Sequence, residues 1–118
     1  MGKRADGALE LDVMRVLWAA TAPLTPGDVR EQLPHPLAYT SVATVLGRLQ
    51  SKGLARRMDA GRAFGYEAAI DEAQWAVQRM TEVLSSTNDR AGVLAGFVGS
   101  LSAKEATALR ALLGESSR

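Results

Sequence analysis

The sequence contains no cysteine and a single histidine, and both scarcities narrow the chemistry available to it. Without cysteine the chain can form no disulfide, no thiolate nucleophile and no cysteine-based zinc or copper site. The histidine, His35, lies between Pro34 and Pro36, and the sequence supports no Ser-His-Asp arrangement around it. Glycine patterns that bind nucleotide phosphates are also missing. We therefore expect a protein that is not an enzyme and that needs no cofactor or metal.

Long hydrophobic runs and a strong net charge are absent as well. No apolar stretch approaches the roughly 18–20 residues that span a bilayer, and the opening residues MGKRADG lack the apolar core of a signal peptide. With 118 residues, 47% hydrophobic and 23% charged, the chain has the composition of one globular domain or of a small domain with an extension. We expect a cytoplasmic location and no membrane insertion.

The net charge of +1 conceals an uneven distribution along the chain. Residues 48–62 hold five basic side chains and one acidic side chain, whereas residues 71–118 hold five basic and six acidic ones. A basic segment in an otherwise neutral chain indicates a phosphate-binding surface. Charge alone leaves open the alternative that this segment is a solvated face without a partner.

Two helices are predicted before the basic segment. The recurrence of apolar residues predicts a helix over residues 9–20, which Pro23 prevents from continuing. Thr25 and Asp28 have the spacing of a capping box, with a proline at the first helical position between them. They predict a second helix over residues 26–33.

A third helix and a hairpin follow. The stretch YTSVATVLGRLQSKGL predicts a helix over residues 39–52, with an apolar stripe of Val42, Val45, Leu46 and Leu49. The period then becomes strand-like, which predicts strands over 54–58 and 63–68 around a glycine-containing turn. Three helices and a small basic hairpin are the plan of a winged helix-turn-helix DNA-binding domain, which we assign to residues 1–70.

The outer face of the third predicted helix is thin, because Thr, Ser and Gly replace the long polar side chains typical of such a face. A helix in the major groove needs a short outer face, so that base edges and phosphates come within reach. We assign base reading to Thr40, Ser41, Ala43, Thr44, Gly47 and Arg48, and contacts of the backbone and wing with DNA to Thr25, Lys52, Arg56, Arg57 and Arg62. The alternative is a buried helix whose small face packs on a neighbour.

Residues 71–118 are predicted to form a three-helix dimerisation region. Asp71 with Gln74, and Ser102 with Glu105, have capping-box spacing at two of the helix starts. So few residues bury little core alone, and their apolar stripes need a partner surface. We expect a homodimer interface made by Trp75, Val77, Met80, Leu84, Val93, Leu94, Phe97, Val98, Leu101, Leu109, Leu112 and Leu113. Folding back onto the winged helix is the alternative, and a small-molecule effector pocket around Trp75 and Phe97 is also left open. The fold class is thus mainly α with a small β-hairpin wing.

The chain resembles one family in several segments taken together. LELDVMRVLW, PLTPGDVREQL, LAYTSVATVLGRLQSKGLARR, GRAFGYEAA and DRAGVLAGFVGSLSAKEATALRALL, in this order, are similar to the BlaI/MecI family of penicillinase and methicillin-resistance repressors. The likeness extends from about Gly7 to Gly114. It implies a homodimeric transcriptional repressor that binds inverted repeats of double-stranded operator DNA.

The resemblance also implies routes by which the operator is released. In members that respond to β-lactam antibiotics, a membrane-bound zinc metalloprotease sensor starts the signal, and the repressor is cut at an Asn-Phe bond of the dimerisation region. The matching pair here is Gly96-Phe97, with glycine in place of asparagine. The copper-sensing branch carries a C-terminal cysteine cluster, which this chain lacks. Binding of an effector is the other route by which the operator could be released.

The alternative function for the whole chain is a winged-helix module that binds protein instead of DNA.

Overall fold

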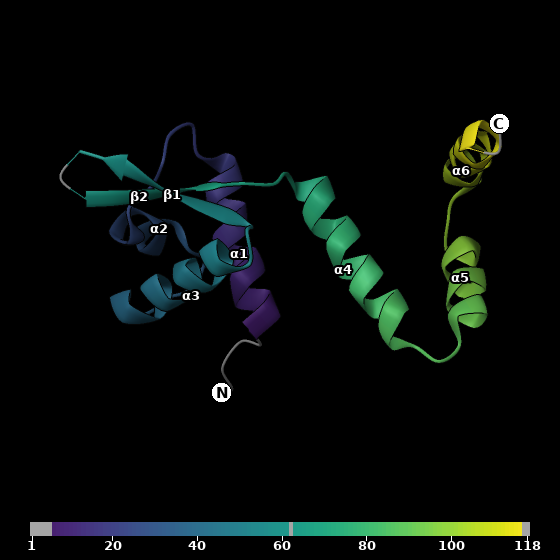
Figure 1. Ribbon diagram of the computed structural model, residues 1–118, viewed down its shortest axis with the longest axis horizontal. Coiled ribbons are helices and arrows are strands. Elements are labelled where there is room, and N and C mark those ends of the chain that lie inside the picture. The colour runs from purple at the N-terminus through teal and green to yellow at the C-terminus, as the bar shows by residue number, and fades with distance from the viewer. Residues whose placement is uncertain (1–5, 62, 117–118) are drawn as a thin grey trace. The chain divides into compact units, whose positions relative to one another are not determined.

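The computed structural model describes residues 6–61 and 63–116 of the chain. The elements follow in the order α1 (Asp6–Ala19), α2 (Pro26–Gln32), α3 (Tyr39–Ser51), β1 (Ala55–Ala60), β2 (Ala63–Ala68), α4 (Glu72–Ser86), α5 (Arg90–Gly99) and α6 (Ala103–Ser116) (Figure 1). The chain is therefore mainly helical with a two-stranded antiparallel hairpin, as predicted. It divides into two compact units after Ala76, within α4.

The N-terminal unit packs α1, α2 and α3 against the hairpin around one core. Tyr66 of β2 also pairs with Leu24 through two backbone hydrogen bonds of 2.7 and 2.9 Å, so the chain before α2 lies along the outer edge of β2. The fully buried side chains at the centre of this core are Val13, Met14, Val29, Val42, Leu46 and Leu49. Helices and hairpin in this arrangement form a winged helix-turn-helix.

Local sequence signals at the helix starts are confirmed. In each capping box, the side-chain oxygen of each residue accepts a hydrogen bond from the backbone N–H of the other. Both distances are 3.1 Å in the Thr25–Asp28 box. They are 2.7 and 2.9 Å in the Asp71–Gln74 box, and 3.1 and 2.9 Å in the Ser102–Glu105 box. Each box satisfies two N–H groups that a helix start otherwise leaves without a partner.

The first three helices each end one residue earlier than predicted, and the larger differences lie at the start of α1 and in β1. α1 begins at Asp6 instead of residue 9, and β1 covers Ala55–Ala60 instead of 54–58. Leu54 lies in the core, and its N–H donates to the carbonyl of Leu49 at 2.9 Å. Leu54 therefore belongs to the turn that closes α3, and the hairpin extends further toward its tip.

A pair of tryptophans fixes the first turn of α4 to the N-terminal unit. The Trp18 and Trp75 rings meet edge to face with centroids 6.1 Å apart, a favourable aromatic geometry. Trp18 Nε1 also donates to the backbone carbonyl of Ile70 at 2.9 Å. Because Trp75 is only 6% exposed, the division between the units falls beyond the predicted boundary at residues 70 and 71.

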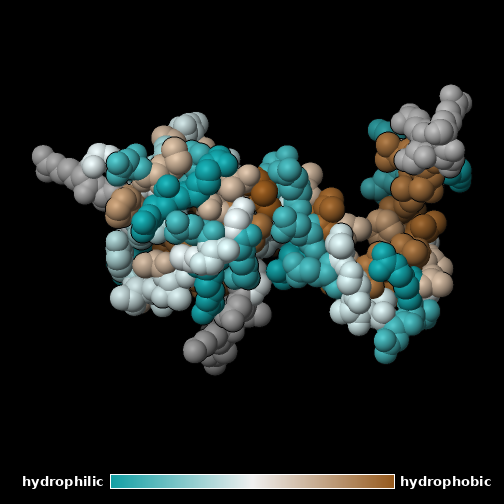
Figure 2. All heavy atoms as spheres, viewed as in Figure 1, coloured by the Kyte–Doolittle hydropathy of each residue, from teal (hydrophilic) through white to brown (hydrophobic). Residues whose placement is uncertain are grey.

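The C-terminal unit holds the rest of α4 together with α5 and α6. Within residues 77–114 no residue is buried, and hydrophobic residues are exposed over α5 and α6 (Figure 2). Across the described part of the chain, no helix combines the length and apolar character needed to cross a bilayer.

Candidate nucleic-acid interface

The inner face of α3 is anchored in the core of the N-terminal unit. Val42, Val45, Leu46 and Leu49 are at most 3% exposed, as the apolar spacing predicted. The opposite face carries Thr40, Ser41, Thr44 and Arg48, which are exposed, and the half-buried Ala43 and Gly47. The six residues assigned to base reading therefore belong to a rigidly held helix, and none of them is part of the buried core.

Two small residues give this outer face its shape. Thr44 Oγ1 donates to the carbonyl of Thr40 at 2.8 Å, so its hydroxyl hydrogen is used within the helix. A Cβ atom added to Gly47 would meet no other atom within 4 Å. The fold thus leaves room for a side chain at Gly47, and packing within the described chain does not require glycine there.

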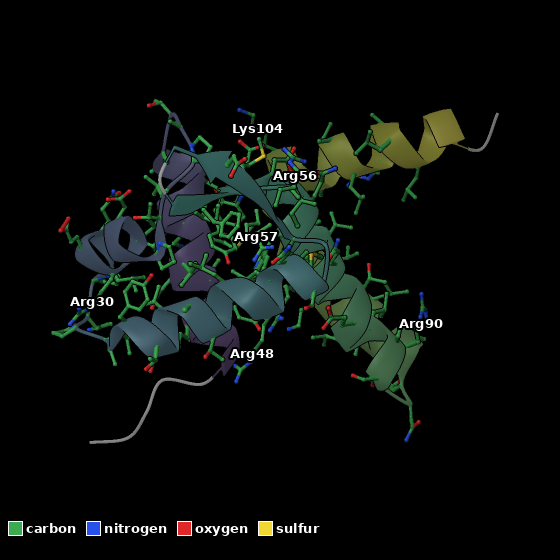
Figure 3. The ribbon with its side chains drawn as sticks, turned by 60° about the vertical axis from the view of Figure 1, so that its left-hand side comes forward. Arg30, Arg48, Arg56, Arg57, Arg90 and Lys104 are labelled. Atoms are coloured by element: carbon green, nitrogen blue, oxygen red, sulfur yellow. The ribbon has the colours of Figure 1, made fainter. Side chains whose placement is uncertain are left out.

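The start of α3 is held by a residue that sequence reasoning missed. Arg30, in the last turn of α2, donates from Nε to the carbonyl of Leu37 at 2.7 Å, which fixes the turn leading into α3. Figure 3 shows Arg30 beside the N-terminal end of α3. Ala38 at the N-cap makes no side-chain cap, and its carbonyl accepts from the Ser41 N–H at 3.0 Å and the Val42 N–H at 3.2 Å. The only sequence signal for Arg30 was its basic charge, which lies outside the basic segment 48–62.

Lys52 and Arg56, two cations of the basic segment, each lie beside a carboxylate of the same chain. Lys52 Nζ lies 2.9 and 3.1 Å from the two carboxylate oxygens of the buried Glu10, so its charge is offset inside the protein. Arg56 pairs with Glu67 across the hairpin at 2.8 Å. The structure therefore gives Lys52 and Arg56, both assigned to DNA, intramolecular carboxylate partners.

Arg48 belongs to the predicted binding face, and Arg57 belongs to β1 of the hairpin. Arg48 is exposed in the last turn of α3 (Figure 3). The Arg57 guanidinium lies over the Phe64 ring, 4.2 Å from its centroid. Arg62, also assigned to the wing, lies outside the described residues. Thr25 Oγ1 accepts from the Asp28 N–H, so the Thr25 side chain caps α2. The arginine-bearing hairpin and the outer face of α3 thus belong to the same unit.

The residues assigned to the dimer interface divide into two groups. Val77, Met80, Val93, Leu94, Phe97, Val98, Leu112 and Leu113 are large hydrophobic residues with 38–60% of their surface exposed, and Val83 joins them at 63%. Leu84, Leu101 and Leu109 are half-buried. Trp75 differs, because its ring packs against Trp18 in the N-terminal core and has little surface left for a second chain. The Gly96-Phe97 pair lies inside α5.

Metal ligands do not gather anywhere in residues 6–61 and 63–116: no group of three or more His, Asp or Glu side chains there could hold an ion. Glu10 and Asp12 of α1 are buried acidic residues in the packed N-terminal unit. The residues assigned to DNA contact carry hydroxyl groups and guanidinium groups, which bind phosphates and base edges.

Comparison with known proteins agrees with the family resemblance. The family model of the penicillinase repressor matches residues 7–115. The transcriptional regulator BlaI of Mycobacterium tuberculosis, from strains H37Rv and CDC 1551 / Oshkosh, is 38% identical over 114 residues, which cover 92% of this chain and 83% of the relative.

Solved structures align less closely. An ArsR-like transcriptional regulator from Rhodococcus sp. RHA1 has a TM-score of 0.48 at 17% identity, covering 82% of this chain and 91% of that one. A MarR family protein from Bacillus stearothermophilus has a TM-score of 0.48 at 18% identity, covering 93% of this chain and 74% of that one. The extent of the family match decides the assignment: the chain belongs to the penicillinase repressor family of transcriptional regulators, which are not enzymes.

Proposed function

We propose that the protein is a homodimeric repressor that binds inverted-repeat operator DNA. In each protomer α3 enters the major groove with its outer face, and the hairpin rests on the neighbouring backbone. The observation that carries the proposal is the contrast within α3, whose inner stripe is buried while its outer face offers only short side chains before Arg48. A rigid helix with a slender outer face can approach base edges closely.

Base reading is proposed for Thr40, Ser41, Ala43, Thr44, Gly47 and Arg48. Hydroxyl groups can hydrogen-bond to several base edges, a threonine methyl can contact a thymine methyl, and arginine can bind guanine with two hydrogen bonds or bind a phosphate. Arg57 is the described cation of the hairpin that we assign to the DNA backbone. Lys52 and Arg56 leave this set, because each is paired with a carboxylate of its own chain.

Dimerisation is proposed through residues 77–113. The apolar side chains of this unit are largely exposed in the single chain, and an exposed contiguous hydrophobic surface marks an interaction site. A second copy is the occupant we favour, because a two-fold dimer presents two recognition helices to two half-sites. Two half-sites in register multiply the specificity of one, and two-fold symmetry explains why the operator is an inverted repeat.

Release of the operator is proposed to follow opening of α5. The Gly96-Phe97 peptide bond lies within this helix, and a protease can bind it only after the helix has opened locally. Gly96, in the interior of α5, lowers helix stability by about 1 kcal/mol relative to alanine, which favours local opening at this bond. Mass spectrometry of the protein from cells exposed to a β-lactam would reveal fragments ending at Gly96 if this bond is the release site.

The test of the proposal is binding to duplex DNA at varied salt. Purified protein should bind fragments of its own promoters more tightly than shuffled duplexes of the same length, and log affinity should fall by about 0.9 per phosphate neutralised for each unit of log salt. A module that binds protein instead would ignore duplex DNA even in dilute buffer. That result would overturn the DNA-binding proposal.

A further inference from the structure

The two adjacent arginines of β1 lie on opposite faces of the hairpin. The register pairs Arg56 with Glu67 and Arg57 with Tyr66. Because directly paired residues of an antiparallel ladder share a face, and consecutive residues of a strand alternate, these pairs lie on different sides. Figure 3 shows the two arginines on either side of the hairpin, with Arg57 on the side of α3.

Arg56 lies on the side away from α3 and has a carboxylate partner. Its Nε and one terminal nitrogen donate to the same Glu67 oxygen at 3.1 and 2.8 Å. Both side chains line an open hollow with Trp18 and Pro23, where α1 ends. Arg56 is therefore poorly placed to bind the phosphates of a duplex that contacts α3, because Glu67 neutralises its charge and its side chain lies on the opposite face of the hairpin.

Arg57 lies on the face that also buries Tyr66 in the core, and its guanidinium lies over the Phe64 ring. Within residues 6–61 and 63–116, Arg57 belongs to neither the Glu10–Lys52 nor the Arg56–Glu67 ion pair. A guanidinium over a ring is attracted by its π-face and keeps its in-plane N–H donors available for a phosphate. The ring therefore restrains the arginine without consuming its hydrogen bonds.

Phe64 lies outside the buried core of the N-terminal unit. Its side chain is 52% exposed, which is costly for a large aromatic residue on a wing that meets water. It lies diagonal to Arg57 on the same face of the ladder, because its direct partner is Asp59. Diagonal neighbours of this kind are within reach of aromatic and long side chains.

We propose that Phe64 is a positioning residue for DNA binding, which holds the Arg57 guanidinium extended beside α3 so that its N–H edge meets a backbone phosphate. Pre-ordering a long side chain lowers the entropy lost when it binds. The inference rests on the proposed function, since it names how one phosphate contact of the same interface is prepared. Arg57, and not Arg56, is then the cation of the wing that neutralises a phosphate.

The test is a double-mutant cycle on a bound promoter duplex, read by fluorescence anisotropy over a series of salt concentrations. Phe64→Leu, which keeps apolar bulk and removes the ring, should weaken binding about 2- to 5-fold for each protomer bound, the equivalent of one exposed cation–π contact. Arg57→Ala should reduce the salt slope by about 0.9 for each protomer bound, which is about 1.8 for a dimer on a complete inverted repeat. In the Arg57→Ala background, Phe64→Leu should have no further effect, and Phe64→Tyr should bind like the wild type.

The matched control removes the other arginine together with its partner. Arg56→Ala combined with Glu67→Ala leaves the net charge unchanged and should leave the salt slope unchanged. The far-ultraviolet circular dichroism of each variant checks that it folds. An equal loss from Phe64→Leu with and without Arg57 would overturn the inference, because Phe64 would then contact DNA by itself. Wild-type affinity in Phe64→Leu would overturn it too, whereas absence of binding by the wild type would overturn the proposed function instead.

Discussion

Both carboxylate oxygens of Glu10 lie within hydrogen-bond distance of Lys52 Nζ, at 2.9 and 3.1 Å, and this pair ties α1 to the C-terminal end of α3. The Glu10 side chain is 4% exposed, whereas the Lys52 side chain is 52% exposed. The carboxylate is thus the group that depends on the pair, because it has left water while the lysine has not. The pair fixes the end of the helix that we assign to base reading.

Lys52→Met should destabilise the fold by about 1–3 kcal/mol, the cost of leaving a buried acceptor without a partner. Adding Glu10→Leu to Lys52→Met should restore much of this loss, since two apolar side chains can replace an ion pair with little change in stability. Urea denaturation of the wild type and both variants measures the two effects. A double variant less stable than Lys52→Met would contradict this account of the pair.

Sequence reasoning reached the features of the fold that depend on near neighbours. The Thr25–Asp28 and Ser102–Glu105 capping boxes each join residues three positions apart, and the stripe of α3 repeats within one helix. Such signals are written in consecutive residues, so periodicity and caps predict them.

The features that it missed depend on residues far apart in the chain. Lys52 was assigned to DNA from its charge, but Glu10, which offsets that charge, lies 42 positions away. Trp75 was expected at the domain junction or at the dimer interface, and the sequence did not reveal that its ring packs edge to face against Trp18, 57 positions away. Which of two partners a side chain takes is decided by tertiary packing, and a single sequence does not record it.

Gly47→Ala should make the protein more stable and its DNA binding weaker. Alanine should add about 0.5–1 kcal/mol to the free energy of unfolding, because glycine in a helix loses more conformational entropy on folding and nothing lies within 4 Å of the added Cβ. The same methyl group would stand between α3 and the floor of the groove. Thermal denaturation and binding to a promoter duplex give the two readouts.

The matched control is Gly114→Ala, in α6, where an added Cβ also meets no atom within 4 Å. It should raise stability without changing affinity for DNA. Unchanged affinity in Gly47→Ala would show that the backbone at this position does not approach the duplex, and it would remove Gly47 from the proposed contact set.

Thr44 is expected to read a base through its methyl group. Its hydroxyl hydrogen already donates to the Thr40 carbonyl, so the methyl is the group best suited to meet a thymine methyl. Thr44→Ala should lower discrimination at one base pair by about 1–3 kcal/mol, whereas Thr44→Val, which keeps a methyl in place, should retain it. Competition with duplexes that carry each single-base change measures the preference. An equal loss in both variants would assign the reading to the hydroxyl oxygen.

Phe97→Asp should convert a dimer into single chains. Phe97 lies in α5 and is 42% exposed, and an aspartate there would have to be buried without a partner if two copies met at this surface. Light scattering should give the mass of two chains for the wild type and of one chain for the variant. Affinity for a complete inverted repeat should fall toward that for a single half-site.

The matched control for this change is Met58→Asp, at a hairpin residue that is 38% exposed and lies outside residues 77–113. It introduces the same charge at an exposed apolar residue, and the mass should remain that of two chains. A wild-type mass of one chain would refute dimerisation through residues 77–113.

Because no residue of 77–114 is buried in the single chain, the monomeric Phe97→Asp variant should also lose helical circular dichroism from this unit. Its apolar side chains have no core of their own to stabilise the helices. Retained helicity in a monomeric Phe97→Asp would mean that the helices of this unit are stable without a partner, and the dimer would then be needed for DNA binding alone.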